Sequence, residues 1–314
     1  MMSKANKLVL VRKSPPRALS PEEEIALIKK KLKQFTTLKP TKYWLDTGNE
    51  FLNRVFGSEE FGIPYGKIFE ISGNESNGKT ALLKRLMALA QRDGATCGVI
   101  MLEDSWDEEW AAKLGVDPKS VYVFRPEIGT FGTEKEIRIT SAEELFSQAE
   151  MWIKRQSERN PDGRMFLGID SIAAILTDEE AAAGIQDQNM RTKVSTATFL
   201  SFLLKRWVAL AATANVMMPF VNQLRLAPGA WGNPEYTPGG KAIRFYAAVR
   251  VKMSRRGKPM LKNGKPVGIK GTLSNWKNKA GGGSREGAKA GYKLYYAGKM
   301  KFVEAEEVKS EAGE

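Results

Sequence analysis

The sequence predicts an α/β protein with a mostly parallel sheet that carries helices on both faces. Residues 73–80 form a glycine-rich phosphate loop between a strand-like segment and a helix-like segment. From residue 67 onward, short apolar segments alternate with longer segments of helical periodicity, the pattern of a doubly covered parallel sheet. After residue 245 the chain reads as strands joined by turns, which predicts an antiparallel extension at one sheet edge.

Residues 1–46 are expected to form a basic arm followed by an N-terminal oligomerisation helix. Ser20, Pro21 and Glu23 give a helix start signal: a hydroxyl cap, a proline in the first turn and an acid three residues after the cap. The helix expected at 21–35 carries its apolar residues at mostly helical spacing. Such a helix can pack on its own core or on a neighbouring copy, and its sequence does not decide between them.

The core domain is expected to span residues 47–302. Its parallel strands are expected at 68–72, 97–102, 121–124, 165–170 and 216–221, and its helices at 79–92, 107–114, 142–159 and 190–212. The antiparallel part is expected at 248–254, 267–276 and 292–296, with a hairpin turn at Asn263-Gly264. The Glu-rich residues 303–314 are expected to form an acidic flexible tail.

The composition limits both the location and the chemistry. No apolar run reaches the roughly 20 residues of a membrane span, and the start of the chain lacks a secretory core. The single Cys97 excludes an internal disulfide and suits a reducing compartment, so a cytoplasmic protein without membrane partners is expected. Because the chain has no histidine, histidine metal sites and histidine general bases are excluded.

The net charge of +13 points to a polyanionic partner. From Lys252 to Lys301 the chain carries fourteen Lys or Arg residues and one acid, Glu286. A short basic run is usually a solvated face, but fifty residues this one-sided favour nucleic acid.

The phosphate loop is the first candidate site, and the alternative is a glycine-rich turn that binds nothing. Gly73 and Gly78 permit the tight turn that points backbone N–H groups at phosphates. Lys79 would neutralise the outer phosphates, and the Thr80 hydroxyl would ligate Mg²⁺. The residues assigned to nucleotide binding in this loop are Gly73, Asn74, Glu75, Ser76, Asn77, Gly78, Lys79 and Thr80.

Two carboxylates complete the candidate chemistry. Asp170 ends the apolar segment 165–170 and would hold a water of the Mg²⁺ shell. Glu103 follows the segment 97–102, where a carboxylate can orient or deprotonate an attacking water. A solvated acid at a strand end is the simpler alternative, and on spacing alone Asp104 and Asp107 compete with Glu103.

Several sequence blocks resemble the bacterial RecA recombinase family: 70–80, 113–117, 169–174, 222–225, 232–242 and 245–250. The block Gly-Asn-Pro-Glu followed by Gly-Gly-Lys-Ala is specific to that family. The blocks keep the family's order and nearly its spacing from about residue 47 to 296, and a shortened, phage-type member fits them. The resemblance implies a RecA-type fold that uses ATP and Mg²⁺ and forms helical filaments on single-stranded DNA. It also implies homologous duplex DNA as a second partner, with single-strand-binding or loader proteins as candidates.

The resemblance also assigns roles to single residues. Glu103 becomes the catalytic glutamate, and Trp110 the aromatic that stacks on adenine, although a Trp there could simply pack in a helix. Gln223 becomes the sensor of the γ-phosphate, the alternative being a polar cap at a strand end. Lys277 and Lys279 would reach a neighbouring subunit's nucleotide as charge stabilisers. Their alternative role is as part of a basic DNA-facing surface.

The same resemblance places the principal DNA-binding loop at 224–241 and a shorter loop at 177–190. The principal loop is rich in Pro and Gly, which is expected to prevent regular structure, and its Trp231 is suited to contact bases. The residues assigned to DNA contacts are Arg191, Arg225, Trp231, Gly232, Asn233, Gly239, Gly240, Lys241 and Arg244.

The leading functional hypothesis is therefore a DNA-dependent ATPase that catalyses homologous pairing and strand exchange. One alternative is a hexameric DNA motor or helicase of related core, although no added helicase domain is found. The other is a non-catalytic ATP-binding regulator, against which Glu103 and Asp170 argue.

Overall fold

The computed structural model describes residues 20–24, 27, 41–103, 106–126, 128–131, 136–182, 190–226, 235–280 and 287–310. The chain divides into two compact units, residues 1–39 and 40–314. In the first unit, residues 21–24 and 27 are helical. The backbone N–H of Ser20 donates to Glu23 Oε2 (2.8 Å), and that of Glu23 donates to Ser20 Oγ (3.2 Å), which is the expected capping box. The rest of the expected helix and the basic arm lie outside the described residues.

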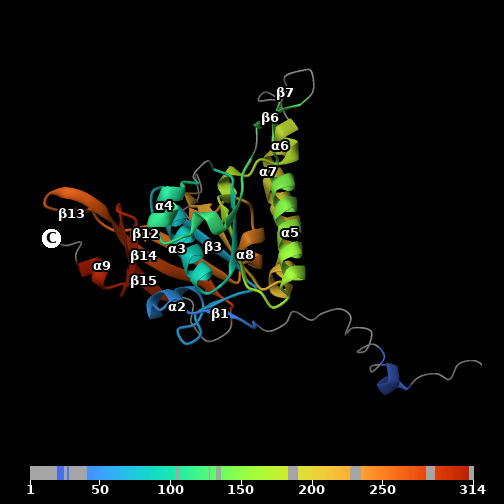
Figure 1. The fold of residues 1–314 in the computed structure, drawn as a ribbon, viewed down its shortest axis with the longest axis horizontal. Coiled ribbons are helices and arrows are strands. Elements are labelled where there is room, and N and C mark those ends of the chain that lie inside the picture. Colours follow the sequence, from blue (N-terminus) through green and yellow to red (C-terminus); the bar gives the residue numbers. More distant parts are fainter. Residues whose placement is uncertain are drawn as a thin grey trace, which may run out of the picture. The chain divides into compact units, whose positions relative to one another are not determined.

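In the second unit, ten of the described strands form one sheet. Its order is β16-β15-β14-β12-β3-β9-β8-β4-β5, and β13 pairs with β14. The parallel strands are β3 (Ile68–Gly73), β4 (Thr96–Met101), β5 (Val121–Phe124), β8 (Met165–Asp170) and β9 (Val216–Gln223). The antiparallel part comprises β12 (Val249–Arg255), β13 (Met260–Lys262), β14 (Lys265–Asn278), β15 (Lys289–Tyr295) and β16 (Lys299–Val303). The predicted α/β fold class is confirmed (Figure 1).

Helices cover both faces of this sheet. On one face, α2 (Glu50–Phe56) and α3 (Lys79–Arg92) pack with alternate strand residues such as Ile71 and Val99. On the other face, α5 (Ala142–Arg159) and α7 (Met190–Thr213) pack together, with the Phe146 and Trp207 rings 5.2 Å apart between centroids. Figure 1 shows α5 and α7 side by side at the right of the sheet. Side chains that alternate along each strand thus fill two separate apolar layers.

The antiparallel part joins the parallel core through β12. This strand pairs in parallel with β3 and antiparallel with β14, so it lies between the two regions. Asn263 and Gly264 have φ of +52° and +74°, as a two-residue type I′ hairpin turn requires. The predicted hairpin turn is confirmed.

Two sequence expectations need correction. Residues 225–226 and 235–236 in the principal loop form a short ladder, β10 (Arg225–Leu226) with β11 (Glu235–Tyr236). None of these four residues is Pro or Gly, so the two ends of the loop can pair as strands. The expected flexible tail is packed as far as it is described: α9 (Glu307–Ser310) buries Val308 completely. The apolar residues Ala305 and Val308 of this segment are buried, and α9 packs on β14 and β15. The acidic composition of the segment did not indicate this packing.

Several short elements were not anticipated from the pattern. They are β1 (Trp44–Leu45), β2 (Ile63–Pro64), β6 (Ile128–Phe131), β7 (Glu136–Ile139), α6 (Asp178–Ala182), α8 (Ala242–Tyr246), η1 (Pro118–Ser120) and η2 (Ile172–Ala174). The helix α2 was also missed, although Asn49 caps it by accepting a hydrogen bond from the Leu52 N–H (2.9 Å). Among the described helices, none combines the length and apolarity that a bilayer crossing requires.

Candidate active site

A cavity of about 510 Å³ lies where β3, β8 and β9 end, at the carboxyl edge of the parallel strands. Ligands of open parallel sheets bind at this edge. The lining residues are Glu75, Ser76, Gly78, Lys79, Thr80, Ala81, Glu103, Trp110, Asp170, Ser171, Val221, Gln223, Arg255, Ile269, Leu294 and Tyr296. Nine of them are residues that the sequence assigned to the nucleotide site.

The phosphate loop takes a backbone path that only small residues permit at two positions. A Cβ added to Gly73 would lie 2.7 Å from the Met253 carbonyl oxygen, closer than side chains approach. Gly78 has φ of +87°, and a Cβ there would lie 2.9 Å from Leu294. Ser76 also has a positive φ, +59°, a left-handed conformation that clusters at functional sites. The loop then leads directly into α3, whose N-terminus favours anions.

The side chains of this loop divide into two groups. Lys79 Nζ donates to the Asn74 carbonyl oxygen (2.8 Å) at the cavity. Asn77 is buried, and its Nδ2 donates to the Met253 carbonyl oxygen (3.1 Å). The Tyr292 hydroxyl donates to the Asn77 carbonyl oxygen (2.8 Å). Asn77 therefore connects the loop to the antiparallel strands, whereas the Lys79 side chain lines the cavity.

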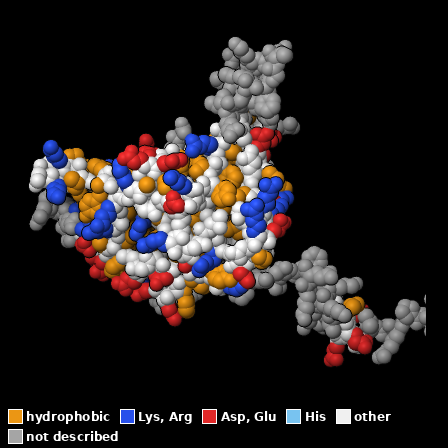
Figure 2. Space-filling model, viewed as in Figure 1, with side chains coloured by type: hydrophobic (Ala, Val, Ile, Leu, Met, Phe, Trp, Pro, Cys, Tyr) orange, Lys and Arg blue, Asp and Glu red, His pale blue; other side chains and the backbone are white. Residues whose placement is uncertain are grey.

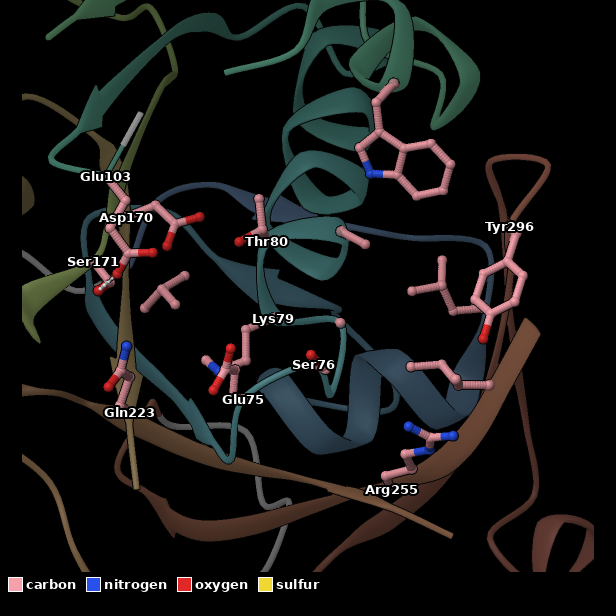
Figure 3. A pocket seen from close by; sticks show the side chains of 16 residues that line it. Glu75, Ser76, Lys79, Thr80, Glu103, Asp170, Ser171, Gln223, Arg255 and Tyr296 are labelled. Atoms are coloured by element: carbon pink, nitrogen blue, oxygen red, sulfur yellow. Dashed lines mark hydrogen bonds between the residues drawn. The ribbon is translucent and has the colours of Figure 1, made fainter. Parts of the chain in front are cut away.

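The acidic wall of the cavity is buried and closely arranged. Asp170 is 2% exposed, and burial raises its pKa to about 6, opposed by a hydrogen bond from Thr80. Glu103 accepts a short hydrogen bond from Ser171 Oγ, and its backbone N–H donates to the Asp170 carbonyl oxygen (3.4 Å). Burial also lowers the pKa of Lys79, while the nearby carboxylates oppose that change. Figure 3 shows Glu103, Asp170 and Ser171 together, with Thr80 beside them.

This wall fits a hard divalent cation. Asp170 Oδ2 is buried without a hydrogen-bond partner among the described residues, so an oxygen ligand is available. Mg²⁺ prefers carboxylate and hydroxyl oxygens and completes its shell with water and phosphate oxygens. Among the described residues there is no cluster of three acidic, His or Cys side chains that would hold a metal by itself. The site therefore suits a metal that arrives with phosphate groups.

The structure separates two of the three acids that compete on spacing. Glu103 lines the cavity. Asp107 instead caps α4 (Glu108–Lys113), because its Oδ1 accepts from the Trp110 N–H (2.9 Å). Asp104 lies outside the described residues. The same cap fixes the start of the helix that brings Trp110 to the cavity wall.

Apart from Ala81 and Val221, which belong to the expected helix and strand beside the site, five lining residues were not singled out from the sequence: Ser171, Arg255, Ile269, Leu294 and Tyr296. Ser171 directly follows Asp170, and this adjacency was the only local signal. The other four come from the antiparallel strands and the residue just after them, which fold back beside the phosphate loop. In Figure 3, Tyr296 and Arg255 lie across the cavity from the acidic wall. Together with Trp110, the Tyr296 ring supplies aromatic surface that suits a nucleobase.

The end of β9 connects this cavity to the principal loop. Gln223 lines the cavity, and its backbone N–H donates to Asn222 Oδ1 (2.9 Å). Asn222 Nδ2 donates both to Glu70 Oε1 (3.0 Å) and to the Pro238 carbonyl oxygen (3.1 Å). Glu70 is fully buried in β3, where Arg250 Nε donates to its Oε2 (2.5 Å). A buried polar network therefore links the phosphate-loop strand to the carboxyl-terminal end of the loop.

Comparison with known proteins agrees with this geometry. Residues 33–146 and 160–297 match the RecA N-terminal domain family. The chain belongs to the RecA family. Protein RecA of Thermus thermophilus is 32% identical over 237 residues, which cover 75% of this chain and 62% of that protein. Protein RecA of Thermus aquaticus is 33% identical over 220 residues, 69% of this chain and 58% of that protein. The aligned part thus spans about six tenths of these relatives.

The RecA family match includes every residue that lines the cavity. It also includes both described ends of the principal loop. On one side, the Leu224 N–H donates to the Gly73 carbonyl oxygen (3.2 Å). On the other side, Gly239 has φ of +88°, and a Cβ there would lie 2.5 Å from Leu200. Glycine at this position lets the loop return close to α7.

The residues assigned to DNA contacts are only partly described. Arg225, Lys241 and Arg244 have exposed side chains at the two ends of the loop, and Gly240 is exposed beside them. Arg191 belongs to α7, but nothing is described of its side chain. Trp231, Gly232 and Asn233 lie outside the described residues, so their assigned roles stay predictions.

The two lysines assigned to the subunit interface lie away from this chain's own cavity. Lys277 Nζ donates to the carbonyl oxygens of Arg244 (2.7 Å) and Phe245 (3.0 Å) at the end of α8. Lys279 has an exposed side chain. Phe245 is 74% exposed, a large apolar side chain that α8 presents to the surroundings. Neither lysine reaches the nucleotide cavity of its own RecA-family core.

Burial of the Asp170 carboxylate is expected to make the free energy of unfolding depend on pH. Because the pKa of Asp170 rises from 3.8 to about 6 in the folded chain, the free energy of unfolding falls as pH rises between these values. Asp170→Asn removes the buried charge, so it should increase the free energy of unfolding at pH 7.5 by about 1–3 kcal/mol. Urea denaturation without nucleotide or Mg²⁺ would measure the gain, which should be smaller at pH 5. An equal gain at both pH values would contradict the role of charge.

Proposed function

We propose that this protein is an ATP-dependent DNA recombinase. It would form helical filaments on single-stranded DNA, pair that strand with homologous duplex DNA and hydrolyse ATP as it does so. The observation that carries the proposal is the hydrogen-bonded path from Gln223 through Asn222 to Glu70 and Pro238. This path gives a nucleotide in the cavity a physical route to the base of a DNA-binding loop.

The phosphate loop and Lys79 would bind the phosphates of ATP, and Trp110 and Tyr296 would contact its base. Thr80 and Asp170 would hold Mg²⁺, which neutralises charge on the phosphate oxygens. Glu103 would orient a water and accept its proton as the oxygen attacks the γ-phosphorus and the bond to the β-phosphate oxygen breaks. Ser171 supports this role because its hydroxyl holds one oxygen of Glu103 in place.

The filament is supported by two lysines and an exposed aromatic ring that lie away from the chain's own nucleotide cavity. Lys277 and Lys279 carry cations on β14 and just after it, outside their own cavity, and Phe245 exposes its ring next to them. At a subunit interface the lysines would stabilise charge on the nucleotide of the neighbouring copy, as an arginine finger does.

The net charge and the cations at the ends of the principal loop support single-stranded DNA as a binding partner. The chain carries a net charge of +13. Arg225, Lys241 and Arg244 stand exposed where the principal loop leaves and rejoins the core. Cations in such positions bind the phosphate backbone irrespective of base sequence. A recombinase needs this kind of contact because it accepts any sequence.

Electron microscopy and ATPase assays together test the proposal. The full chain would be imaged with single-stranded DNA and a non-hydrolysable ATP analogue, and ATP hydrolysis would be measured with and without the strand. Open helical filaments and DNA-stimulated hydrolysis are expected. Closed rings would favour a hexameric motor, and DNA binding without hydrolysis would favour a regulator. A chain that stays monomeric and ignores DNA with and without ATP would overturn the proposal.

A further inference from the structure

Lys84, in the second turn of α3, is a buried lysine. Figure 2 shows many Lys and Arg side chains at the surface of the face in view, whereas the side chain of Lys84 is only 2% exposed. A lysine is rarely buried unless other groups compensate its charge. Burial lowers the pKa of Lys84, and the nearby charges of Asp107 and Asp170 oppose that change. The groups around Lys84 therefore indicate what this cation does.

Lys84 lies close to the acidic wall of the nucleotide cavity. It follows Thr80 by about one helical turn, so the two side chains share one face of α3. Thr80 on this face forms a hydrogen bond to Asp170. Lys84 itself is not one of the described residues that line the cavity. It therefore does not contact a bound nucleotide and can act on the site only through its neighbours.

Two contacts connect Lys84 to the segment between Glu103 and Trp110. Its Nζ lies 5.1 Å from the centre of the Trp106 ring, which is a cation–π contact. The same Nζ donates a long hydrogen bond to the Asp107 carbonyl oxygen (3.5 Å). These two neighbours follow Glu103 by three and four residues. Lys84 thus connects the helix that begins at the phosphate loop to the segment that carries the proposed general base.

The Trp106 ring depends on this contact because its own polar group does not orient it. A buried indole N–H usually has a hydrogen-bond partner, but Trp106 Nε1 is buried without one among the described residues. Trp106 also borders a second cavity, of about 400 Å³, which Glu103 lines as well. Packing is therefore incomplete on that side of the ring, and the ammonium group of Lys84 provides a directional contact.

We propose that Lys84 is a positioning residue for ATP hydrolysis, which holds Glu103 beside the attacking water through its contact with Trp106. This role rests on the proposed function, because it assumes that Glu103 accepts a proton from that water. A misplacement of about 1 Å can lower a rate about 100-fold, so a residue that contacts no substrate can still matter. Ser171 holds one oxygen of the Glu103 carboxylate, and Lys84 restrains the chain that follows it.

Lys84→Met tests this role, because methionine suits a buried position but carries no charge. We expect kcat for ATP hydrolysis with saturating single-stranded DNA to fall by about tenfold to 100-fold. The affinity for a fluorescent ATP analogue should change by less than about threefold. Trp106→Leu removes the other partner of the contact and should give a similar loss. Lys84→Arg should restore most of the activity, because a guanidinium also binds an aromatic face.

A control and a second background separate positioning from a general loss of folded protein. Lys205→Met makes the same change at the exposed surface of α7 and should leave kcat within about twofold. In a Glu103→Gln background, Lys84→Met should lower the residual hydrolysis by less than about twofold, because the group that it positions is already inactive.

Three results would overturn this inference alone: an unchanged kcat in Lys84→Met, near-normal hydrolysis by Trp106→Leu, or an equal factor of loss with and without Glu103. The Trp106 variant decides the question even if Lys84→Met does not fold, which thermal unfolding followed by circular dichroism would show. A wild-type chain that does not hydrolyse ATP would overturn the proposed function itself, and this inference with it.

Discussion

Lys79→Ala is expected to lower kcat/KM for ATP hydrolysis by about 100-fold or more. Lys79 lies in the cavity between the phosphate loop and the two carboxylates, and among the described lining residues it is the one lysine that can neutralise the outer phosphates. Alanine leaves the loop backbone intact but removes this charge from a half-buried position. Steady-state hydrolysis with saturating single-stranded DNA would measure the effect.

The same variant tests whether nucleotide binding and DNA binding are coupled. If the γ-phosphate acts through Gln223 and Asn222 on the principal loop, Lys79→Ala should also lose ATP-dependent filament formation. Lys205→Ala provides a control, because it makes the same side-chain change on the exposed surface of α7. Normal strand exchange by the Lys79 variant would refute the coupling, even if hydrolysis were lost.

The phosphate-loop side of the site was predictable because its signals are local. The apolar strand, the glycine-rich turn and the helix stand next to one another in the sequence, and the carboxylates follow similar apolar strands. The end of each apolar strand therefore indicates a candidate site residue: Asp170 is the last residue of β8, and Glu103 lies just beyond β4. Parallel strands place their carboxyl ends at one edge, so separate local signals meet in one cavity.

The opposite wall was not predictable, because it depends on long-range pairing. Tyr296 and Arg255 reach the cavity only because β12 pairs with β3 across about 180 residues of sequence. An exposed Tyr after a strand and an Arg at a strand end are common, so neither carries a local signal. The wrong expectations for β10–β11 and α9 have the same cause. Local composition favoured irregular chain, whereas tertiary contacts with β12 and β15 decide the structure.

The buried polar pairs could not be predicted from the sequence either. Glu70 looks like a surface acid within an apolar strand, yet it is fully buried between Arg250 and Asn222. Nothing near residue 70 reveals partners that lie 152 and 180 residues away. A buried charge persists only when paired, so such a network is set by the completed fold.

Glu103→Gln is expected to lower kcat for ATP hydrolysis by about 10²–10⁴-fold while ATP still binds. Glutamine has nearly the same shape, and its amide oxygen can accept the hydrogen bond from Ser171. It cannot take the proton of the attacking water, so the loss should appear in kcat and not in nucleotide affinity. Single-turnover hydrolysis and binding of a fluorescent ATP analogue would separate the two quantities.

The Glu103 variant should also form filaments that disassemble more slowly, because a nucleotide that is not hydrolysed keeps its γ-phosphate at Gln223. Ser171→Ala offers a graded comparison: it leaves the carboxylate but removes its hydrogen bond, so a loss of about tenfold is expected. Near-normal hydrolysis by Glu103→Gln would transfer the catalytic role to another acid. Asp107 is the weaker candidate, since its carboxylate already caps α4, and Asp104→Asn would then be the decisive variant.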